Sequence, residues 1–227
     1  MKTTPVRLAV LLLAVITGLS FSSCGRSKEK KTETVKESST EKIQLFNGND
    51  LTNWAFFLRD PSVDASEVFT VQNDVIHITG NPFGYMRTKE SYSDYTLHLE
   101  WRYPLELSNS GVFIHAQLPD TIWPKCIECQ LKAGNAGDFV AMGGSDMNER
   151  TDKSVRVVAK LAGSTEKAVG EWNTMEVTCI ADNIDVFVNG VLMNKATGVT
   201  LKEGHICIQS EGKDIEFRNV YLTRLKK

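Results

Sequence analysis

The chain has 227 residues, of which 41% are hydrophobic and 24% are charged, and its formal net charge is −2. These values are typical of a soluble globular protein with a single domain, once the N-terminal segment is set aside. Because the chain has no excess of basic residues and its Lys and Arg residues do not collect on one stripe, we exclude nucleic acid as an expected partner.

Residues 1–23 have the features of a secretion signal. A positively charged start is followed by an apolar run from Leu8 to Leu19 and by small residues directly before Cys24. The apolar run is too short for a membrane span. The segment resembles a bacterial lipoprotein signal peptide, in which Cys24 becomes the lipid-bearing first residue of the mature chain. The alternative is an ordinary cleaved signal followed by an incidental cysteine.

Residues 24–42 are predicted to form a flexible tether. The stretch consists mainly of Lys, Glu, Ser and Thr, and it has too few apolar residues to bury a core. A lipid on Cys24 would make the membrane a partner of the protein, and the tether would hold the folded part away from the membrane surface. We therefore expect a lipoprotein of the cell envelope, in the periplasm or at the outer membrane.

Residues 43–227 alternate between apolar and polar positions in short runs that are broken by Gly, Asn, Asp and Pro. A period of two indicates β-strands, and no long helical stripe competes with it. The predicted strands are Ile43–Phe46, Val68–Gln72, Val75–Thr79, Tyr85–Thr88, Tyr95–Tyr103, Gly111–Ala116, Ile127–Leu131, Val155–Leu161, Asn173–Ala181, Asn183–Val188, Val191–Lys195, Gly204–Gln209 and Ile215–Leu225.

Turn-forming dipeptides separate several of these strands. Tight reversals are predicted at Asn73-Asp74, Ala181-Asp182 and Asn189-Gly190. Many short strands with frequent turns favour a two-sheet antiparallel sandwich or jelly roll over a parallel fold with crossover helices. The fold class is therefore predicted to be all-β.

The segment Lys132–Lys153 differs from its surroundings because several glycines and polar residues interrupt any hydrophobic period. It is predicted to be a long surface loop. Loops of this length are unusual in a compact β domain unless they cover a site, so we expect it to form a rim or lid beside the strand that carries Glu128 and Gln130.

Four cysteines remain once Cys24 is assigned to the lipid. The envelope compartment would permit disulfides. Cys126 and Cys129 have the spacing of a zinc or redox motif, but no second such pair follows, and in a strand their side chains would face opposite ways. Cys179 and Cys207 lie among apolar residues, either as free core residues or as a bridge.

Polar side chains recur at alternate positions of otherwise apolar strands. They are Glu100, Arg102, His115, Glu128 and Gln130. A solvated strand face normally mixes Lys, Thr and Ser, whereas this set combines carboxylates, a guanidinium, an imidazole and an amide. We therefore expect the five side chains to line one cleft. The alternative is an exposed sheet face on which Glu100 and Arg102 pair with each other.

Several segments occur together in a characteristic order: LFNGNDLTNW, YSDYTLHLEWRYP, SNSGVFIHA, IECQL, GEWNTMEV, DVFVNG and IQSEGKDIEFRNVYLTRL. They resemble the 3-keto-disaccharide hydrolase domain family, and the resemblance covers Ile43 to Lys227. It implies a concanavalin A-like jelly-roll sandwich whose concave face handles sugars.

The chain also departs from the family pattern at several positions. Many members carry Arg where His115 stands, and the strand that contains Glu128 has Ile127 and Cys129 in place of the usual aromatic-Glu-x-Gln pattern. Near the C-terminus, Glu211 stands in a region where members often have His or Asp. These differences concern the identity of the substrate.

The resemblance implies a glycoside substrate that is oxidised to a ketone at carbon 3. The ketone acidifies the proton on carbon 2, so that a base can remove it and expel the group at carbon 1 by elimination or hydrolysis. The predicted catalytic residues are Glu100, Glu128 and His115. The predicted substrate-binding residues are Arg102, Asn109, Gln130, Trp172, Gln209 and Glu211. Trp172 has an alternative role in core packing at the start of its strand.

Other functions stay open on the sequence alone. A carboxylate pair also suits an ordinary glycoside hydrolase. Two carboxylates with His115 suit a divalent cation, although no metal ligands are assigned. A carbohydrate-binding module without catalysis would use the same face to hold a carbohydrate. A cell-envelope interaction domain would use the fold only as a scaffold, with the segment Lys132–Lys153 blocking the groove.

Overall fold

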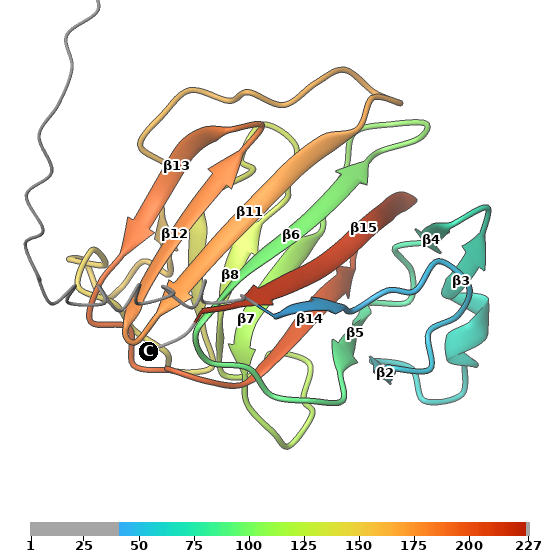
Figure 1. The fold of residues 1–227 in the computed structure, drawn as a ribbon, viewed down its shortest axis with the longest axis horizontal. Coiled ribbons are helices and arrows are strands. Elements are labelled where there is room, and N and C mark those ends of the chain that lie inside the picture. Colours follow the sequence, from blue (N-terminus) through green and yellow to red (C-terminus); the bar gives the residue numbers. More distant parts are fainter. Residues whose placement is uncertain (1–40, 226–227) are drawn as a thin grey trace, which may run out of the picture. The chain divides into compact units, whose positions relative to one another are not determined.

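The computed structural model describes residues 41–225. The predicted signal peptide, the predicted lipidation site Cys24 and the predicted tether as far as residue 40 lie outside these residues, whereas Lys42, which was assigned to the tether, begins the first strand. The described part consists of two β-sheets and a short 3₁₀-helix, η1 (Ala65–Glu67), as Figure 1 shows. Within this range, no helix is long and apolar enough to cross a membrane.

Sheet A contains eight strands in the described range, and their pairings are antiparallel. Their spatial order is β13 (Val191–Ala196), β12 (Asn183–Val188), β11 (Asn173–Ile180), β6 (Tyr95–Arg102), β15 (Ile215–Arg224), β4 (Val75–Ile78) and β3 (Phe69–Gln72), and β1 (Lys42–Gln44) also pairs with β15.

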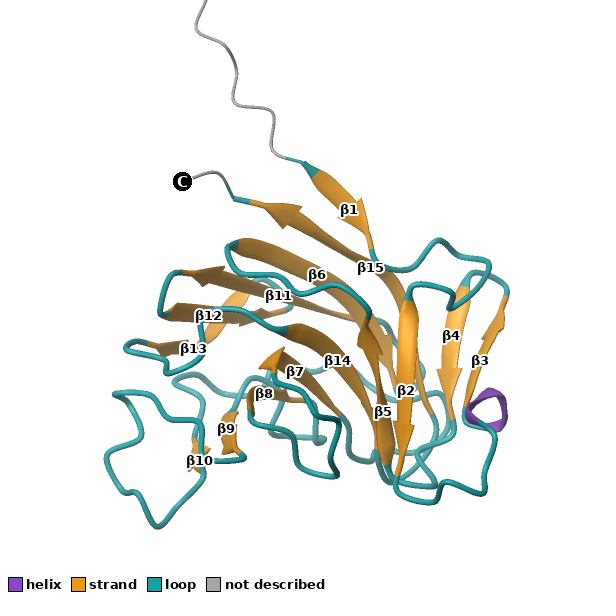
Figure 2. Ribbon diagram, turned by 90° about the horizontal axis from the view of Figure 1, so that it is seen from below, coloured by secondary structure: helices purple, strands orange, loops and turns teal. Residues whose placement is uncertain are grey.

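Sheet B contains seven strands of the described chain, also paired antiparallel. Their spatial order is β10 (Val157–Val158), β9 (Phe139–Met142), β8 (Cys126–Gln130), β7 (Gly111–Ala116), β14 (His205–Ser210), β5 (Gly84–Thr88) and β2 (Trp54–Leu58). Figure 2 shows the two sheets stacked as layers. The predicted all-β sandwich of two antiparallel sheets is confirmed.

The core lies between the two sheets and follows from the alternation along each strand. In β6, Leu97, Leu99 and Trp101 are 0% exposed, and the residues between them are only partly buried. From sheet B, Val112 and Ile114 of β7 belong to the same buried cluster. Each such side chain contributes roughly 1.5–3 kcal/mol when it is fully removed from water. This burial fixes which face of each strand points outward.

The predicted turns form because their residues adopt positive φ angles. Asn73 and Asp74 have φ angles of 53° and 59° between β3 and β4, and Asn189 and Gly190 have 49° and 79° between β12 and β13. Asn, Asp and Gly tolerate this conformation better than other residues. The third predicted reversal, at Ala181, joins β11 to β12. All three predicted hairpins are therefore confirmed.

Two strands escaped the sequence prediction because they lack alternation. β2 (WAFFL) and β9 (FVAM) are continuous apolar runs, and all of β9 is buried. A strand that is covered on both faces, like β9, reads in this way rather than with a period of two. β2 is instead an edge strand of which only Trp54 is buried. The predicted strand Val155–Leu161 shrinks to the two residues of β10. The prediction of Lys132–Lys153 as one long loop is thus wrong over β9, which joins sheet B.

All four cysteines in the described residues are free and buried. Cys126 and Cys129 face opposite sides of β8, since Cys129 belongs to the main core and Cys126 to a second apolar cluster. Cys207 belongs to this second cluster, whereas Cys179 belongs to the main core. Within the described chain these residues therefore act as apolar side chains of the interior.

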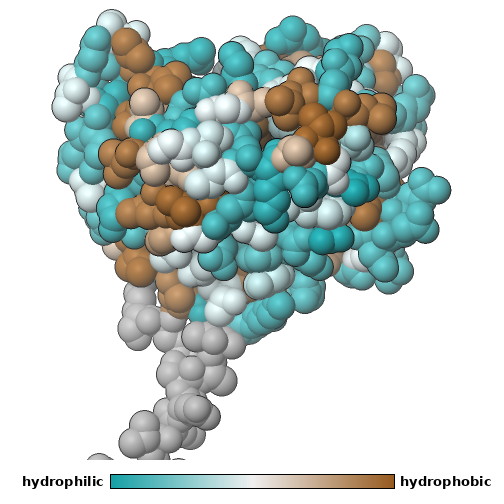
Figure 3. Space-filling model, turned by 90° about the horizontal axis from the view of Figure 1, so that it is seen from above, coloured by the Kyte–Doolittle hydropathy of each residue, from teal (hydrophilic) through white to brown (hydrophobic). Residues whose placement is uncertain are grey.

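Apolar side chains on the surface are spread over several loops and strands. Leu105 and Leu161 are the most exposed of the large apolar residues described, at 77% and 71%. On the face drawn in Figure 3, apolar residues lie in separate patches among hydrophilic ones. Isolated apolar side chains of this kind are an ordinary feature of protein surfaces.

Candidate active site

The face of sheet B that points away from the main core carries a group of polar side chains. Glu128 on β8 lies beside Phe113 on β7, and two residues further along β8 Gln130 lies beside Gly111. Gln209 on β14 has the same orientation, since its neighbour along the strand is in the main core. Alternate residues of a strand share a face, so the glutamate and the two amide side chains lie on one surface.

Gly111 leaves the space that the Glu128 side chain occupies. A Cβ atom at position 111 would lie 2.3 Å from Oε1 of Glu128, which is far closer than two such atoms can approach. The glycine therefore allows the carboxyl group to fold over β7 instead of extending into solvent. As a result Glu128 is only 4% exposed, although it stands on an outward face.

Glu128 is held in an environment that favours its protonated form. Burial and, to a lesser extent, the negative charge of Glu211 raise the pKa of its carboxyl group to about 8, against the opposing effect of the positive charge of Arg156. No group within residues 41–225 donates a hydrogen bond to this carboxyl group. A buried acid that lacks a partner and titrates near neutral pH is suited to proton transfer.

Glu211 lies near Glu128, directly after β14, and has two amide neighbours. Burial raises its pKa, and hydrogen bonds from the side chains of Asn109 and Gln209 act in the opposite direction. The backbones of Asn109 and Glu211 also form a β-bridge. In the described chain, the Oδ1 atom of Asn109 and the Oε1 atom of Gln209 are buried without a hydrogen-bond partner. These two oxygens are available to accept hydrogen bonds from the hydroxyl groups of a ligand.

A hollow of about 540 Å³ opens beside Glu211. Its walls include Arg59, Phe83, Trp123 and Lys213. This volume is in the range of small-molecule sites in proteins. Trp123 is 43% exposed, and its ring centroid lies 4.8 Å from that of Phe83. The surface therefore combines two neighbouring acids with an aromatic and cationic hollow.

Glu100 and Arg102 lie on the other side of the molecule. Both belong to β6, and they project from the outward face of sheet A. Glu100 accepts hydrogen bonds from Arg218 at 2.7 Å and from Asn219 at 2.6 Å, while Arg102 pairs with Glu216. The expectation that they share one cleft with Glu128 is wrong, because β6 and β8 belong to different sheets. The alternative that they pair with each other is also wrong, because the partners of both are side chains of β15.

Trp172 belongs to this same face of sheet A. The guanidinium groups of Arg102 and Arg218 lie over its ring, 4.6 and 4.1 Å from the ring centroid. Trp172 therefore stacks with cations of sheet A and lies apart from the Glu128 surface, so the geometry does not support its prediction as a substrate-binding residue of that surface. Core packing is not its role either, since the ring lies on the outer surface of the sheet.

His115 is not on the Glu128 surface. It has a φ angle of 55°, and the pairing of β7 with β14 shifts register at this point. This irregularity breaks the alternation, and His115 is only 1% exposed. Its Nδ1 atom lies 3.0 Å from the carbonyl oxygen of Leu201, and its ring meets Tyr95 edge-on. Burial lowers its pKa, so the imidazole is neutral at physiological pH.

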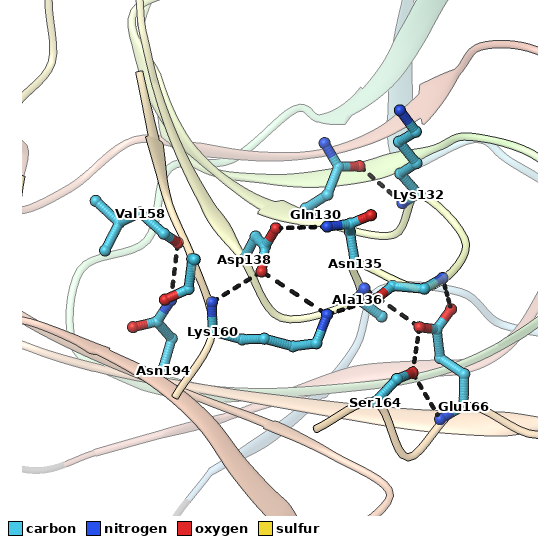
Figure 4. Close-up of polar contacts among 12 residues, drawn as sticks. Gln130, Lys132, Asn135, Ala136, Asp138, Val158, Lys160, Ser164, Glu166 and Asn194 are labelled. Carbon is cyan, nitrogen blue, oxygen red and sulfur yellow. Dashed lines mark hydrogen bonds and ion pairs between the residues drawn. The ribbon is translucent and has the colours of Figure 1, made fainter. Parts of the chain in front are cut away.

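Gln130 lies at the rim of the Glu128 surface. Its Oε1 atom accepts hydrogen bonds from the next two backbone N–H groups, at 2.9 and 2.8 Å. Figure 4 shows the segment that follows, in which Asn135 donates a hydrogen bond to Asp138 and Glu166 faces the turn. The backbone N–H of Lys160 donates to Asp138 at 2.8 Å. The first part of the predicted loop is thus a rim held by hydrogen bonds.

The described residues do not bring together the cation ligands considered from the sequence. Glu100, Glu128 and His115 occupy three separate places in the fold, as described above. Among residues 41–225, no group of three or more His, Cys, Asp or Glu side chains is arranged to hold a metal ion. The structure brings together five of the predicted site residues: Asn109, Glu128, Gln130, Gln209 and Glu211.

Sequence reasoning missed three residues that adjoin this surface. Trp123 was too isolated in the sequence to be assigned a role, and Arg59 lies outside the resembling segments. Arg156 acts on Glu128 only through the fold. The signal that would have found the site is Gly111, because a glycine inside an apolar strand indicates that another group approaches the backbone closely.

Solved structures with the same fold are carbohydrate-related proteins. A candidate glycosyl hydrolase of Parabacteroides distasonis ATCC 8503 is 20% identical with a TM-score of 0.62, and the match covers 82% of this chain and 94% of that one. The β-glucanase of Bacillus licheniformis is 11% identical with a TM-score of 0.55, over 85% and 100% of the two chains. The carbohydrate-binding module CBM66 of Bacillus subtilis is 11% identical with a TM-score of 0.54, over 74% and 94%. At these identities the likeness establishes the fold, which is the predicted concanavalin A-like sandwich.

No curated protein matches the sequence. A family model does match it, and this model is described as a 3-keto-alpha-glucoside-1,2-lyase-like domain. The match extends over residues 41–223, which is nearly the whole described region and well over half of the chain. It is the family that the ordered sequence segments resemble. The chain therefore belongs to the family of 3-keto-alpha-glucoside-1,2-lyase-like domains.

Proposed function

We propose that the protein cleaves the glycosidic bond of 3-keto-glycosides on the outward face of sheet B, with Glu128 and Glu211 as its proton-transfer groups. The membership of the family supports the substrate class. The pair of acids supports the reaction type, since removal of a proton from carbon 2 and protonation of the departing oxygen need two such groups. The substrate is a carbohydrate whose ketone at carbon 3 makes the carbon 2 proton acidic.

In the first step, the ionised carboxylate of Glu128 accepts the proton from carbon 2. The raised pKa of Glu128 makes this carboxylate a stronger base than an ordinary glutamate. Because two neighbouring carboxylates avoid carrying charge at the same time, ionisation of Glu128 favours a protonated Glu211. The pair thus shares one proton, which rests on Glu128 because the pKa of this group is raised to about 8. The reactive form is the one in which Glu128 is ionised and Glu211 carries the proton that the leaving group needs.

In the second step, the electrons of the carbon 2–hydrogen bond form a double bond to carbon 1, and the bond between carbon 1 and the glycosidic oxygen breaks. Glu211 donates its proton to this oxygen. The products are a free alcohol and an unsaturated keto sugar, and the site has moved one proton from Glu211 to Glu128. Addition of water across the double bond would turn this elimination into a net hydrolysis. Asn109 and Gln209 accept hydrogen bonds from sugar hydroxyl groups through their unpaired oxygens.

The observation that carries this proposal is the carboxyl group of Glu128, buried over Gly111 without a hydrogen-bond donor and next to a second acid. A buried acid left in this state destabilises the folded protein, so its presence calls for a functional reason. An ordinary glycosidase would also use two acids, but the family favours the keto sugar as substrate.

The test is incubation of the purified residues 41–227 domain with matched native and 3-keto glycosides, with product identification by NMR. Cleavage of the keto forms alone supports the proposal, and a substrate deuterated at carbon 2 should then react several-fold more slowly. Cleavage of the native glycosides would identify an ordinary glycosidase. Binding without cleavage of either set would identify a carbohydrate-binding module. A parallel series with a chelator tests whether a divalent cation takes part.

The location of the protein remains part of this proposal. We place it in the cell envelope, anchored through a lipid on Cys24 and held at a distance by residues 24–42. The composition of the N-terminal segment supports this placement. Metabolic labelling with a fatty acid tests it: the full-length protein should incorporate the label, and a Cys24→Ser variant should not.

A further inference from the structure

The hollow beside Glu211 extends the candidate site away from Glu128. Glu211 forms part of its wall and is also the acid whose charge acts on Glu128. In the proposed reaction, the keto sugar lies at Glu128 and Glu211 protonates the departing oxygen. The group attached to that oxygen is therefore directed into the hollow. The residues of the hollow then decide which leaving groups the protein accepts.

Two cationic side chains line this hollow without a strong partner. The guanidinium group of Arg59 lies 5.0 Å from the ring centroid of Phe83, and no carboxylate among residues 41–225 lies within ion-pair distance of it. Lys213 pairs with Glu106 at 3.6 Å, but both side chains are 61% exposed, and a pair of this kind is weak. The charge of Arg59 also acts on Glu211 in the wall of the same hollow. A ligand therefore competes for these cations with the weak Lys213–Glu106 pair, with the charge of Glu211 when it is ionised, and with water.

The aromatic wall of the hollow is fixed in place before a ligand binds. Trp123 belongs to the loop between β7 and β8, and Asp120 of this loop accepts hydrogen bonds from the Arg87 guanidinium at 2.9, 3.1 and 3.0 Å. The Tyr85 hydroxyl contacts the same carboxylate at 3.2 Å. These bonds anchor the loop to β5. Because the loop is already ordered, stacking on Trp123 costs little conformational entropy.

We infer that the hollow binds the leaving group of the substrate and selects leaving groups that bear an anionic oxygen substituent, a carboxylate or a sulfate, through Arg59 and Lys213. A guanidinium group matches the two oxygens of such a group by a bidentate hydrogen bond. The exposed face of Trp123 provides a stacking surface for the ring that carries the substituent. This inference rests on the proposed function for the direction in which the leaving group points.

Kinetics with paired substrates test the inference. The phenyl and the 4-carboxyphenyl 3-keto-glucosides differ only in the anionic group, and a 3-keto-glucoside of glucuronic acid carries the same group on a sugar. The wild-type protein should have a higher kcat/KM for both anionic substrates than for the phenyl glucoside. The two anionic substrates show whether the protein prefers a carboxylate on an aromatic ring or on a sugar ring. A higher kcat/KM for either of them than for the phenyl glucoside supports the inference. Equal or lower values for both would overturn it.

Substitution of Arg59 provides a second test of the inference. In Arg59→Gln, the ratio of kcat/KM for the carboxyphenyl substrate to that for the phenyl substrate should fall on the order of tenfold, mainly through KM, because a charge-assisted hydrogen bond is lost. The matched control is Arg224→Gln, an exposed arginine of sheet A, which should keep the wild-type ratio. An unchanged ratio in Arg59→Gln would contradict the assignment of that residue.

A binding experiment separates this inference from the proposed function. The tryptophan fluorescence of the domain is titrated with 4-hydroxybenzoate and with glucuronate, and the Glu128→Gln variant is included. Saturable binding that survives in Glu128→Gln and weakens in Arg59→Gln and Trp123→Ala supports the hollow as an anion site, even if no 3-keto-glycoside is cleaved. Turnover of 3-keto-glycosides without anion preference and without this binding leaves the proposed function intact and overturns the inference.

Discussion

The two outward faces of the sandwich carry similar residues in opposite states. On sheet A, Glu100 is partly accessible to solvent and Glu216 is buried, but each of them is paired with an arginine. On sheet B, Glu128 is buried, and no described group donates a hydrogen bond to it. The pKa of Glu100 is lowered in spite of its partial burial, through hydrogen bonds from Asn219 and Arg218, whereas that of Glu128 is raised.

This difference shows that the type of residue does not by itself identify a site. A carboxylate with donors on both oxygens has no free capacity to exchange a proton with a ligand. Such pairs on an accessible surface contribute about 0–1 kcal/mol each to stability. A buried carboxyl group without a partner works against stability instead, and it remains available for chemistry. The comparison therefore indicates that the acids on the outward face of sheet A have a structural role and that those on the outward face of sheet B form the functional site.

The largest effect should come from the same substitution made on each face. Glu128→Gln should lower turnover of a 3-keto-glycoside by about 100- to 10,000-fold, because the amide cannot accept the carbon 2 proton. Glu100→Gln should leave turnover within about twofold of the wild type. The measurement is kcat/KM for both variants, with circular dichroism to establish that each is folded. Equal losses in the two variants would show that the faces do not differ in function.

A second test changes Gly111, against which the Glu128 side chain packs, and leaves Glu128 itself unchanged. In Gly111→Ala, the new Cβ would stand 2.3 Å from the present position of the carboxyl oxygen, so the Glu128 side chain has to move. A displaced base should cost on the order of 100-fold in kcat. Gly163→Ala is a matched control for glycine loss in open space, because no atom lies within 4 Å of a Cβ at that position and, as at Gly111, the φ angle is not in the left-handed region. Full activity in folded Gly111→Ala would show that the position of Glu128 is unimportant.

The strands and turns could be predicted because they depend on neighbours in sequence. Alternation along β6 located its buried and exposed sides correctly, and Asn189-Gly190 located a hairpin. The sheet that each strand joins depends on pairing between distant segments, and no local pattern encodes it. For this reason Glu100 and Glu128 looked equivalent in the sequence and were assigned to one cleft.

Local irregularities of the backbone are the second reason why the site could be predicted only in part. His115 left the predicted face because a positive φ angle and a register shift interrupt the alternation of β7, and neither feature has a clear signal in the residues around it. The residues at the end of β14 and directly after it were placed better: Gln209 and Glu211 both reached the surface that was expected for them. The candidate site could thus be predicted where regular strands carry it, and not where a bulge redirects a side chain.

The third prediction concerns stability and pH, and it does not depend on activity. The pKa of Glu128 rises from an ordinary value of 4.5 to about 8 on folding, so the folded state retains the proton longer than the unfolded state. The stability that this group contributes is present below pH 4.5 and is lost as the pH rises toward 8. Glu128→Gln has no proton to lose.

The free energy of unfolding of Glu128→Gln relative to the wild type should therefore increase from pH 5 to pH 8, by an amount on the order of a few kcal/mol. Urea unfolding at several pH values measures this difference. Glu100→Gln should show no such trend between pH 5 and pH 8, because the pKa of Glu100 is lowered from 4.5 and its contribution to stability is lost only as the pH falls below that value. A pH-independent difference for Glu128→Gln would show that this acid is ordinary.

The smallest effect should come from Trp172 on sheet A. Trp172→Ala removes the ring over which the guanidinium groups of Arg102 and Arg218 lie. Cation–π contacts at accessible sites are worth roughly 0.5–1 kcal/mol each, so the variant should lose about 1–2 kcal/mol of unfolding free energy. Its kcat/KM for 3-keto-glycosides should stay within about twofold of the wild type, because no part of the Glu128 surface depends on this ring. A loss of activity as large as that of Glu128→Gln, in a folded variant, would move the site to sheet A and reverse the assignment of the two faces.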